Sequence, residues 1–116
     1  MDGKYRDAIA EASTILMDAI LEDADELIAE GRQLDGKVRK VVFQLGLFLV
    51  RNLFLALQKK LIEGAKAKGF TVERRPVVTF KTVFGPMELE SVYLYDREQG
   101  QGYRPLREEF GVVGGC

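Results

Sequence analysis

Apolar residues recur at steps of three and four residues through two stretches of the chain, and this spacing predicts two long helices. The first stretch runs from Tyr5 to Glu30 and is expected to end at Gly31. Its apolar stripe consists of Ile9, Ala12, Leu16, Ile20, Ala24, Leu27 and Ile28. The second stretch starts at Asp35, the expected N-cap, and continues to Lys68, where Gly69 is expected to stop it.

The second predicted helix carries two apolar seams instead of one. The first seam is formed by Phe43, Leu47, Val50, Phe54, Leu57 and Leu61, and the second by Val38, Val42, Leu45, Leu49, Leu53 and Ala56. A helix of this length spans roughly 50 Å, whereas a compact domain of this size is roughly 35 Å across. We therefore expect the first seam to be the interface of a homodimer or larger oligomer, with Arg51 and Asn52 fixing the register or pairing with acids of the first helix. Two alternatives stay open: the rest of the chain covers both seams, or additional sequence covers one.

After Gly69 the pattern changes to the alternation that is typical of strands. Two strands are predicted, at residues 71–84 and 87–95, with Gly85 and Pro86 in the tight connection between them. Alternation places Val78, Phe80 and Phe84 on one face of the first strand. Residues 96–105 are expected to form a loop, and 106–110 a single helical turn that ends at Gly111.

These elements predict an α+β fold: two long antiparallel helices followed by a β-hairpin and a short C-terminal helical turn. All 116 residues are assigned to one domain. Within it we expect a helical hairpin at 1–69, a β-hairpin at 70–95, and a loop with the C-terminal tail at 96–116. The abrupt apolar ending of the tail suggests a chain cut from something longer.

Charge is distributed unevenly along a chain whose formal net charge is only −1. Residues 1–36 contain ten acids and three bases, 37–81 contain eleven bases and two acids, and 82–116 contain six acids and three bases. Such asymmetry indicates that one region neutralises another or that the basic middle faces an acidic partner. Both interpretations stay open: an acidic first helix beside a basic second one, or Lys and Arg clusters facing DNA phosphates.

The most apolar run, 41–57, is the only stretch that invites comparison with a membrane span. It is shorter than the roughly 20 residues that a span requires, and it contains Arg51, which is costly in lipid. The acidic, polar amino terminus also differs from a cleavable signal. We therefore expect a cytoplasmic protein with no membrane partner.

The residue inventory excludes several classes of catalytic site. The chain has no histidine and a single cysteine, Cys116, at its end. Without histidine there is no Ser-His triad and no HExxH zinc site, and one cysteine forms neither a disulfide framework nor a zinc knuckle. We expect no catalytic residues, no metal ligands and no cofactor.

The candidate functional residues are therefore basic and aromatic. The densest basic group, expected to contact DNA phosphates near the helix-to-strand junction, is Lys66, Lys68, Arg74, Arg75 and Lys81. The alternative is a solvated helix end that the helix dipole favours. Tyrosines that could stack on bases are Tyr93, Tyr95 and Tyr103, although cross-strand packing is the commoner role of such residues.

Residues 79–111, TFKTVFGPMELESVYLYDREQGQGYRPLREEFG, resemble the amino-terminal region of insertion-sequence transposases of the ISKra and ISLre types. That family shows a strand, a Gly-Pro or Phe-Gly turn, a second strand ending in paired aromatics, and a Pro-Leu-Asp-Glu-x-Leu-Gly segment. The matching positions are Thr82, Phe84, Gly85, Pro86, Tyr93, Tyr95, Pro105, Leu106, Glu108, Phe110 and Gly111. Where many relatives have a Cys-x-x-Cys knuckle, this chain has residues 96–99, Asp-Arg-Glu-Gln, so no zinc role carries over.

The resemblance implies a non-catalytic, DNA-binding and dimerising domain from the amino-terminal part of a transposase, or a truncated remnant of one. The catalytic acids of the family lie in a downstream domain that this sequence lacks. The alternative is a homodimeric protein-interaction module that binds no nucleic acid.

Overall fold

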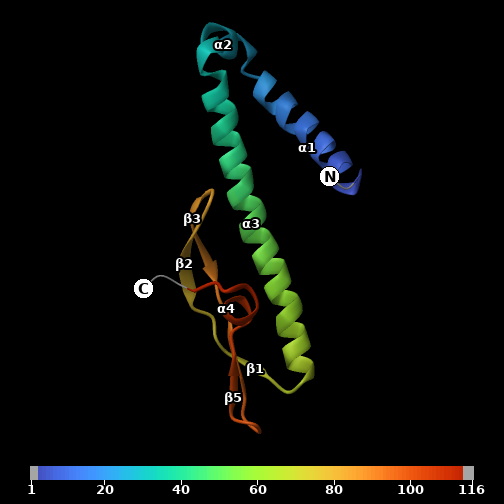
Figure 1. Cartoon of the computed structure of the whole chain (residues 1–116), viewed down its shortest axis with the longest axis vertical. Helices are drawn as coiled ribbons and strands as arrows, with labels where there is room; N and C mark the ends of the chain where they lie inside the picture. The colour runs from blue at the N-terminus through green and yellow to red at the C-terminus, as the bar shows by residue number, and fades with distance from the viewer. Residues whose placement is uncertain (1–2, 114–116) are drawn as a thin grey trace. The chain divides into compact units, whose positions relative to one another are not determined.

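The computed structural model describes residues 3–113, so Cys116 lies outside the described residues. The chain divides into two compact units between Arg39 and Lys40, a boundary that falls inside the longest helix. The class is α+β, as predicted: a long helix is followed by antiparallel strands and a short C-terminal helix (Figure 1).

The first unit is helical, but its helix is interrupted. Where one helix was expected over 5–30, α1 spans Gly3–Leu21 and α2 spans Ala24–Ala29, followed by a short 3-10 turn, η1, at Gly31–Gln33. The break lies at Glu22 and Asp23, beside Asp25 and Glu26, and like charges three and four residues apart destabilise a continuous helix. The antiparallel pairing of two long helices stays a prediction.

The long helix α3 spans Leu34–Ala67. Asp35 lies inside its first turn and is not the N-cap that was expected, although a carboxylate there still complements the helix dipole. The predicted stop at Gly69 is confirmed. Gly69 has φ of 102°, and the Phe70 N–H donates to the Ala65 carbonyl at 3.1 Å, which closes the helix end.

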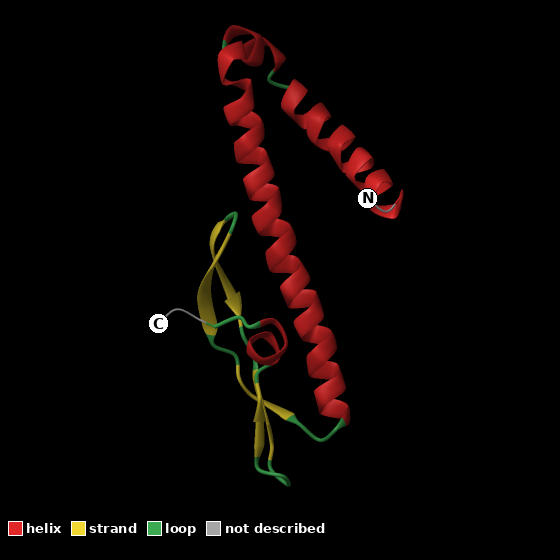
Figure 2. Cartoon of the chain, in the orientation of Figure 1, coloured by secondary structure: helices red, strands yellow, loops and turns green. Residues whose placement is uncertain are grey.

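Each of the two long strands that the sequence predicted is divided in the middle. β1 (Thr71–Arg74), β4 (Tyr93–Asp96) and β5 (Gln101–Tyr103) form a three-stranded antiparallel sheet in the order β1-β4-β5. β2 (Val77–Thr82) and β3 (Gly85–Glu90) form a separate antiparallel pair. Figure 2 shows the two groups of strands and the loops between them. β5 lies within the region that was expected to be loop.

The division has two identifiable causes. Pro76 has no N–H to contribute to a ladder, so β1 and β2 cannot be continuous through it. On the opposite strand, the Gln58 side chain of α3 occupies the gap: its Nε2 donates to the Glu90 carbonyl and its Oε1 accepts from the Val92 N–H, both at 2.8 Å. The helix thus satisfies the backbone where the strands separate.

The β2–β3 connection also differs by two residues from the expected one. Val83 and Phe84 form the turn, while Gly85 and Pro86 already belong to β3. The Thr82 hydroxyl accepts from the Phe84 N–H at 3.0 Å and donates to the Gly85 carbonyl at 2.9 Å. Val78 and Phe80 point toward the core, as alternation predicted.

The core of the second unit lies between α3 and the strands, in two clusters. The first contains Met87, Leu89, Leu106 and Val112, and the second contains Ala65, Val92 and Leu94. The predicted C-terminal helical turn is α4 (Pro105–Phe110), which contributes buried Leu106 and ends at Gly111 with φ of 69°. The first cluster thus packs the β2–β3 pair and α4 against α3, and the second packs the three-stranded sheet against the end of α3.

Candidate nucleic-acid interface

The first apolar seam of α3 packs partly inside the chain. Leu47, Val50 and Phe54 contact the first core cluster, and the Phe54 ring lies edge-on to Phe80 at 5.5 Å between centroids. Leu61 is half-buried, whereas Phe43 and Leu57 retain 36% and 42% exposure. The strands therefore cover part of this seam within one chain, and its role as a dimer interface stays a prediction.

The two polar residues in the middle of α3 bond within the chain. The Arg51 Nε donates to the Glu88 carbonyl of β3 at 3.1 Å, and the Asn52 Nδ2 donates to the Phe48 carbonyl one turn earlier at 2.8 Å. Neither of these two contacts involves an acid of the first helix. Arg51 and Gln58 together satisfy carbonyls along β3, an edge that has no strand neighbour other than β2 in the described residues.

The five basic residues that the sequence singled out do not form one cluster. Lys66 and Lys68 lie at the C-terminal end of α3, and Lys81 projects from the exposed side of β2. Arg75 forms an exposed ion pair with Glu90 at 2.9 Å. Arg74, its neighbour in sequence, instead lies over the ring of Tyr93, with its guanidinium carbon 4.9 Å from the ring centroid.

Tyr93 also carries a second guanidinium. The guanidinium carbon of Arg104 lies 4.8 Å from the centroid of the same ring. Register explains the arrangement: Arg74 pairs with Tyr93 across β1–β4, and because Leu94 pairs with Tyr103, Arg104 follows opposite Tyr93 on the other side. We call Arg74, Tyr93 and Arg104 the Arg–Tyr row; it crosses the sheet at its outer face, opposite the side of buried Leu94.

Two local features build the Arg–Tyr row. A β-bulge lies between Val72 and Arg74, so the register shifts and Arg74, not Glu73, is the residue paired with Tyr93. On the other side, Gly102 leaves room for the ring, because a Cβ at this position would lie 2.6 Å from the Tyr93 hydroxyl. The bulge therefore places Arg74 instead of Glu73 opposite Tyr93, and Gly102 leaves space for the Tyr93 ring.

The acids around the row have other partners. Glu73 lies 3.7 Å from the Arg97 guanidinium, and the Glu108 carboxylate accepts from the Arg104 backbone N–H at 2.6 Å. Within residues 3–113, the ion pairs of the structure leave Arg74, Arg104 and Arg107 without a carboxylate partner. Two depressions on this face are lined by four arginines and two glutamates, so its net charge is positive.

Shallow depressions flank the ring. One, of about 410 Å³, is lined by Arg74, Tyr93 and Tyr95 together with Glu73 and Arg97. The other, of about 290 Å³, is lined on the α4 side by Tyr93, Gly102, Tyr103, Arg104, Arg107 and Glu108. Both are open surfaces and not enclosed pockets, so the face suits an extended polymer better than a small molecule.

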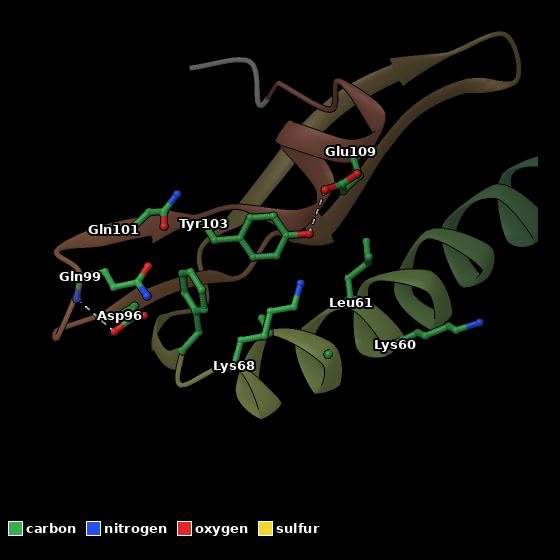
Figure 3. A pocket seen from close by; sticks show the side chains of 11 residues that line it. Lys60, Leu61, Lys68, Asp96, Gln99, Gln101, Tyr103 and Glu109 are labelled. Atoms are coloured by element: carbon green, nitrogen blue, oxygen red, sulfur yellow. Dashed lines mark hydrogen bonds between the residues drawn. The ribbon is translucent and has the colours of Figure 1, made fainter.

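A larger cleft, of about 760 Å³, lies between the end of α3, the β4–β5 hairpin and α4 (Figure 3). Two of its polar side chains bond within the fold: the Tyr103 hydroxyl donates to Glu109 at 3.1 Å, and Asp96 accepts from the Glu98 backbone N–H. Burial, then the hydrogen bond to Glu109 and the charges of Glu109 and Glu108, raise the pKa of Tyr103 to about 12. Tyr103 is therefore protonated near neutral pH and acts as a donor within the fold.

Lys68 and Lys60 border this cleft, so one of the predicted phosphate contacts lies there and not on the Arg–Tyr row. Of the three tyrosines, Tyr103 packs edge-on to Phe70, with 6.0 Å between centroids, which is a packing role. Within residues 3–113, no three His, Cys, Asp or Glu side chains gather as a metal site would require.

Sequence reasoning named Arg74 and Tyr93 separately and omitted Arg104. The sequence signal that could have linked them is Gly102. It stands two residues before Arg104, the spacing that puts two residues on the same face of a strand, but this stretch was expected to be a loop. Comparisons with family models, with curated proteins and with solved structures give no match to this chain. The transposase resemblance stays a prediction that rests on sequence motifs.

Proposed function

We propose that this chain is a non-catalytic DNA-binding domain whose phosphate contacts are made by the Arg–Tyr row. The observation that carries the proposal is that Arg74 and Arg104 both lie over the ring of Tyr93 without a carboxylate partner in the described residues. A guanidinium stacked on a ring keeps its N–H donors in its own plane, and that planar fork matches phosphate geometry.

Other basic residues extend the proposed contact. Arg107 lines the same surface as Arg104. Lys66, Lys68 and Lys81 are exposed and supply weaker, longer-range attraction for phosphate. Arg75 is already paired with Glu90, so it gains less from a phosphate partner than Arg74 does.

The proposed place of this domain is the amino-terminal part of a transposase, or a remnant of it. Support comes from Gly111, which ends α4 as the resembling segment would require, whereas Gly85 and Pro86 begin β3 and do not form the turn. Tyr93, one of the paired aromatics, is the centre of the Arg–Tyr row. DNA binding is the function that such a domain would contribute.

Fluorescence anisotropy with a labelled 20-base-pair duplex tests the proposal. We expect binding that weakens steeply as salt rises, because Lys and Arg release counterions from the phosphates. The double variant Arg74→Ala/Arg104→Ala should lower the salt slope by about two, one for each lost contact. Lys40→Ala/Lys59→Ala removes the same charge from α3 and is the control. No binding at about 20 mM salt would contradict the proposal and favour a protein-interaction module.

A second candidate function is homodimerisation, and an exposed face of α3 favours it. This outer face is the second seam, in which Val42, Leu49 and Leu53 are each about half exposed. Phe48 and Leu57 flank it, and because they are nine residues apart they project from opposite sides of the helix. A stripe of half-exposed aliphatic side chains on one helix is a surface that the same stripe of a second copy could cover across a two-fold axis.

A membrane is the competing partner for this face. Residues Gly31–Ala67 are long and apolar enough to cross a bilayer by length and composition, which is weak evidence by itself. Against a span, Arg51 bonds to β3 in the middle of this stretch, and β2–β3 carry the charges of Lys81 and Glu88 beside it. Those groups would enter the hydrocarbon with the helix, at a cost of several kcal/mol each. We therefore propose a second copy as the partner and the cytoplasm as the location.

Light scattering over a tenfold concentration range tests the dimer. We expect twice the chain mass in the wild type, and dissociation in Leu49→Asp, whose side chain is exposed and so leaves the core intact. Lys59→Asp is the control for charge on the same helix. A 13 kDa species at every concentration would refute dimerisation, and co-flotation with liposomes would indicate a membrane-binding face instead.

A further inference from the structure

The ring faces of Tyr93 are already used inside the protein. Proteins that bind single strands stack unpaired bases on exposed aromatic rings. Tyr93 instead carries the guanidiniums of Arg74 and Arg104, both within 5 Å of its centroid. A base would have to displace an arginine to stack there. This arrangement holds arginines in place and does not offer an aromatic platform.

The spacing of the row also fits a polymer of phosphates. Arg74 and Arg104 are on the outer strand positions, with β4 between them, so their Cα atoms are about 10 Å apart, two strand spacings. Their side chains converge on one ring, which fixes the two guanidiniums relative to each other. Because each guanidinium carbon lies within 5 Å of the Tyr93 centroid, the two cations are less than 10 Å apart and could contact two phosphates of one backbone.

We propose that the Arg–Tyr row binds the sugar-phosphate backbone of double-stranded DNA without stacking on its bases, and that Tyr93 and Gly102 are positioning residues for Arg74 and Arg104. This inference rests on the proposed DNA-binding function and specifies that the ligand is duplex DNA, bound through its phosphates. Binding by backbone contact carries little sequence preference. The duplex supplies the regular, rigid array of phosphates that a pre-arranged pair of cations requires.

Tyr95 defines the competing mode. It is paired with Gly102 on one side and with Thr71 on the other, so its neighbours across the strands are small, whereas those of Tyr93 are arginines. An unpaired base could stack on it. Base stacking quenches tyrosine emission, which is measurable in this chain because it contains no tryptophan.

The experiment compares a 20-base-pair duplex with each of its single strands, by anisotropy at fixed salt, for four variants. Gly102→Ala is the decisive one, because it alters no charge and its Cβ overlaps the Tyr93 hydroxyl. We expect Gly102→Ala and Tyr93→Leu to weaken duplex binding about tenfold. Tyr93→Phe, which keeps the ring, and Tyr95→Leu should stay within twofold of the wild type. Near-UV circular dichroism confirms that each variant is folded.

The outcomes separate this inference from the function on which it rests. If the wild type binds neither form of DNA, the proposed function itself is wrong. If the duplex binds and both Gly102→Ala and Tyr93→Leu bind as tightly as the wild type, DNA binding stands and the positioning role is refuted. Tighter binding of a single strand, with quenched tyrosine emission that Tyr95→Leu abolishes, would establish base stacking and overturn the inference.

Discussion

Gln58 should be the most sensitive polar position of the second unit, and its replacement by leucine tests how α3 holds the divided strands. The side chain is 3% exposed and makes two hydrogen bonds of 2.8 Å, to the Glu90 carbonyl and from the Val92 N–H. Leucine fills a similar volume but satisfies neither group. A buried polar group left without a partner costs about 1–3 kcal/mol. Since the Glu90 carbonyl is only partly buried, we expect Gln58→Leu to lower the free energy of unfolding by about 2–4 kcal/mol.

Urea unfolding followed by near-UV circular dichroism measures this loss, because Tyr93, Tyr95 and Tyr103 report on the strands. With an m value of about 1–1.5 kcal/mol/M for a unit of this size, the midpoint should fall by about 1.3–4 M. Gln44→Leu makes the same chemical change at an exposed position of the same helix and should shift the midpoint by less than about 0.5 M. Equal midpoints for the two variants would refute the reasoning that the amide satisfies the gap between the strands.

The variant Gln58→Glu tests the direction in which the free energy of unfolding changes with pH. Its carboxylate can accept from the Val92 N–H but cannot donate to the Glu90 carbonyl, whereas the protonated acid can do both. Burial and the facing carbonyl disfavour the charged form, so the folded pKa should lie above the ordinary value of about 4.3. The folded state then binds the proton more tightly than the unfolded state. Gln58→Glu should therefore be most stable below about pH 4.3, relative to wild type, and lose stability as pH rises through the folded pKa.

Three further changes have defined outcomes. Gly46→Ala places a Cβ closer to three carbons of the Phe84 ring than van der Waals contact allows, so overpacking of about 1–3 kcal/mol should outweigh the gain of up to about 1 kcal/mol in helix propensity. Thermal denaturation should show a lower Tm for this variant, whereas Gly64→Ala, with open space around it, should raise the Tm. Tyr103→Phe should remove a pH dependence of stability. In the wild type the folded pKa of Tyr103, about 12, lies above its unfolded value of 10, so the contribution to the free energy of unfolding is complete below pH 10 and falls toward pH 12. Urea midpoints at pH 8, 10 and 11 should therefore diverge between the two proteins as the pH rises. Arg75→Ala breaks only an exposed ion pair and should change the free energy of unfolding by less than about 1 kcal/mol in urea titration; a larger loss would show that the pair is a structural anchor.

Local chemistry in the sequence was sufficient for the elements whose ends depend on neighbouring residues. The spacing of apolar residues predicted the long second helix, and Gly69 and Gly111 ended helices as expected because a left-handed residue closes a helix end locally. Alternation correctly placed Val78 and Phe80 toward the core. These features depend on contacts within a few residues along the chain, which is the range over which a single sequence is informative.

The division of the strands was decided by a contact that is distant in sequence. Nothing near residue 91 signals that a strand ends there, since the group that replaces the missing ladder is Gln58, more than thirty residues earlier. The same is true of the two seams of α3. Both are apolar and regularly spaced, so only the position of β2 and β3 showed that part of the first seam packs inside the chain.

The sequence identified two of the three residues of the Arg–Tyr row, Arg74 and Tyr93, but not that they meet. Arg74 and Arg75 are adjacent and chemically identical, so a sequence gives no reason to separate their roles. The tertiary structure separates them, because a bulge pairs Arg74 with Tyr93, whereas Arg75 reaches Glu90. Arg104 joins the site only through the register of β4 with β5, in a stretch that was expected to be loop. Composition and periodicity therefore determined the helices and the supply of arginines, but strand register decided which arginines meet, because a shift of one residue in pairing changes which side chains face each other.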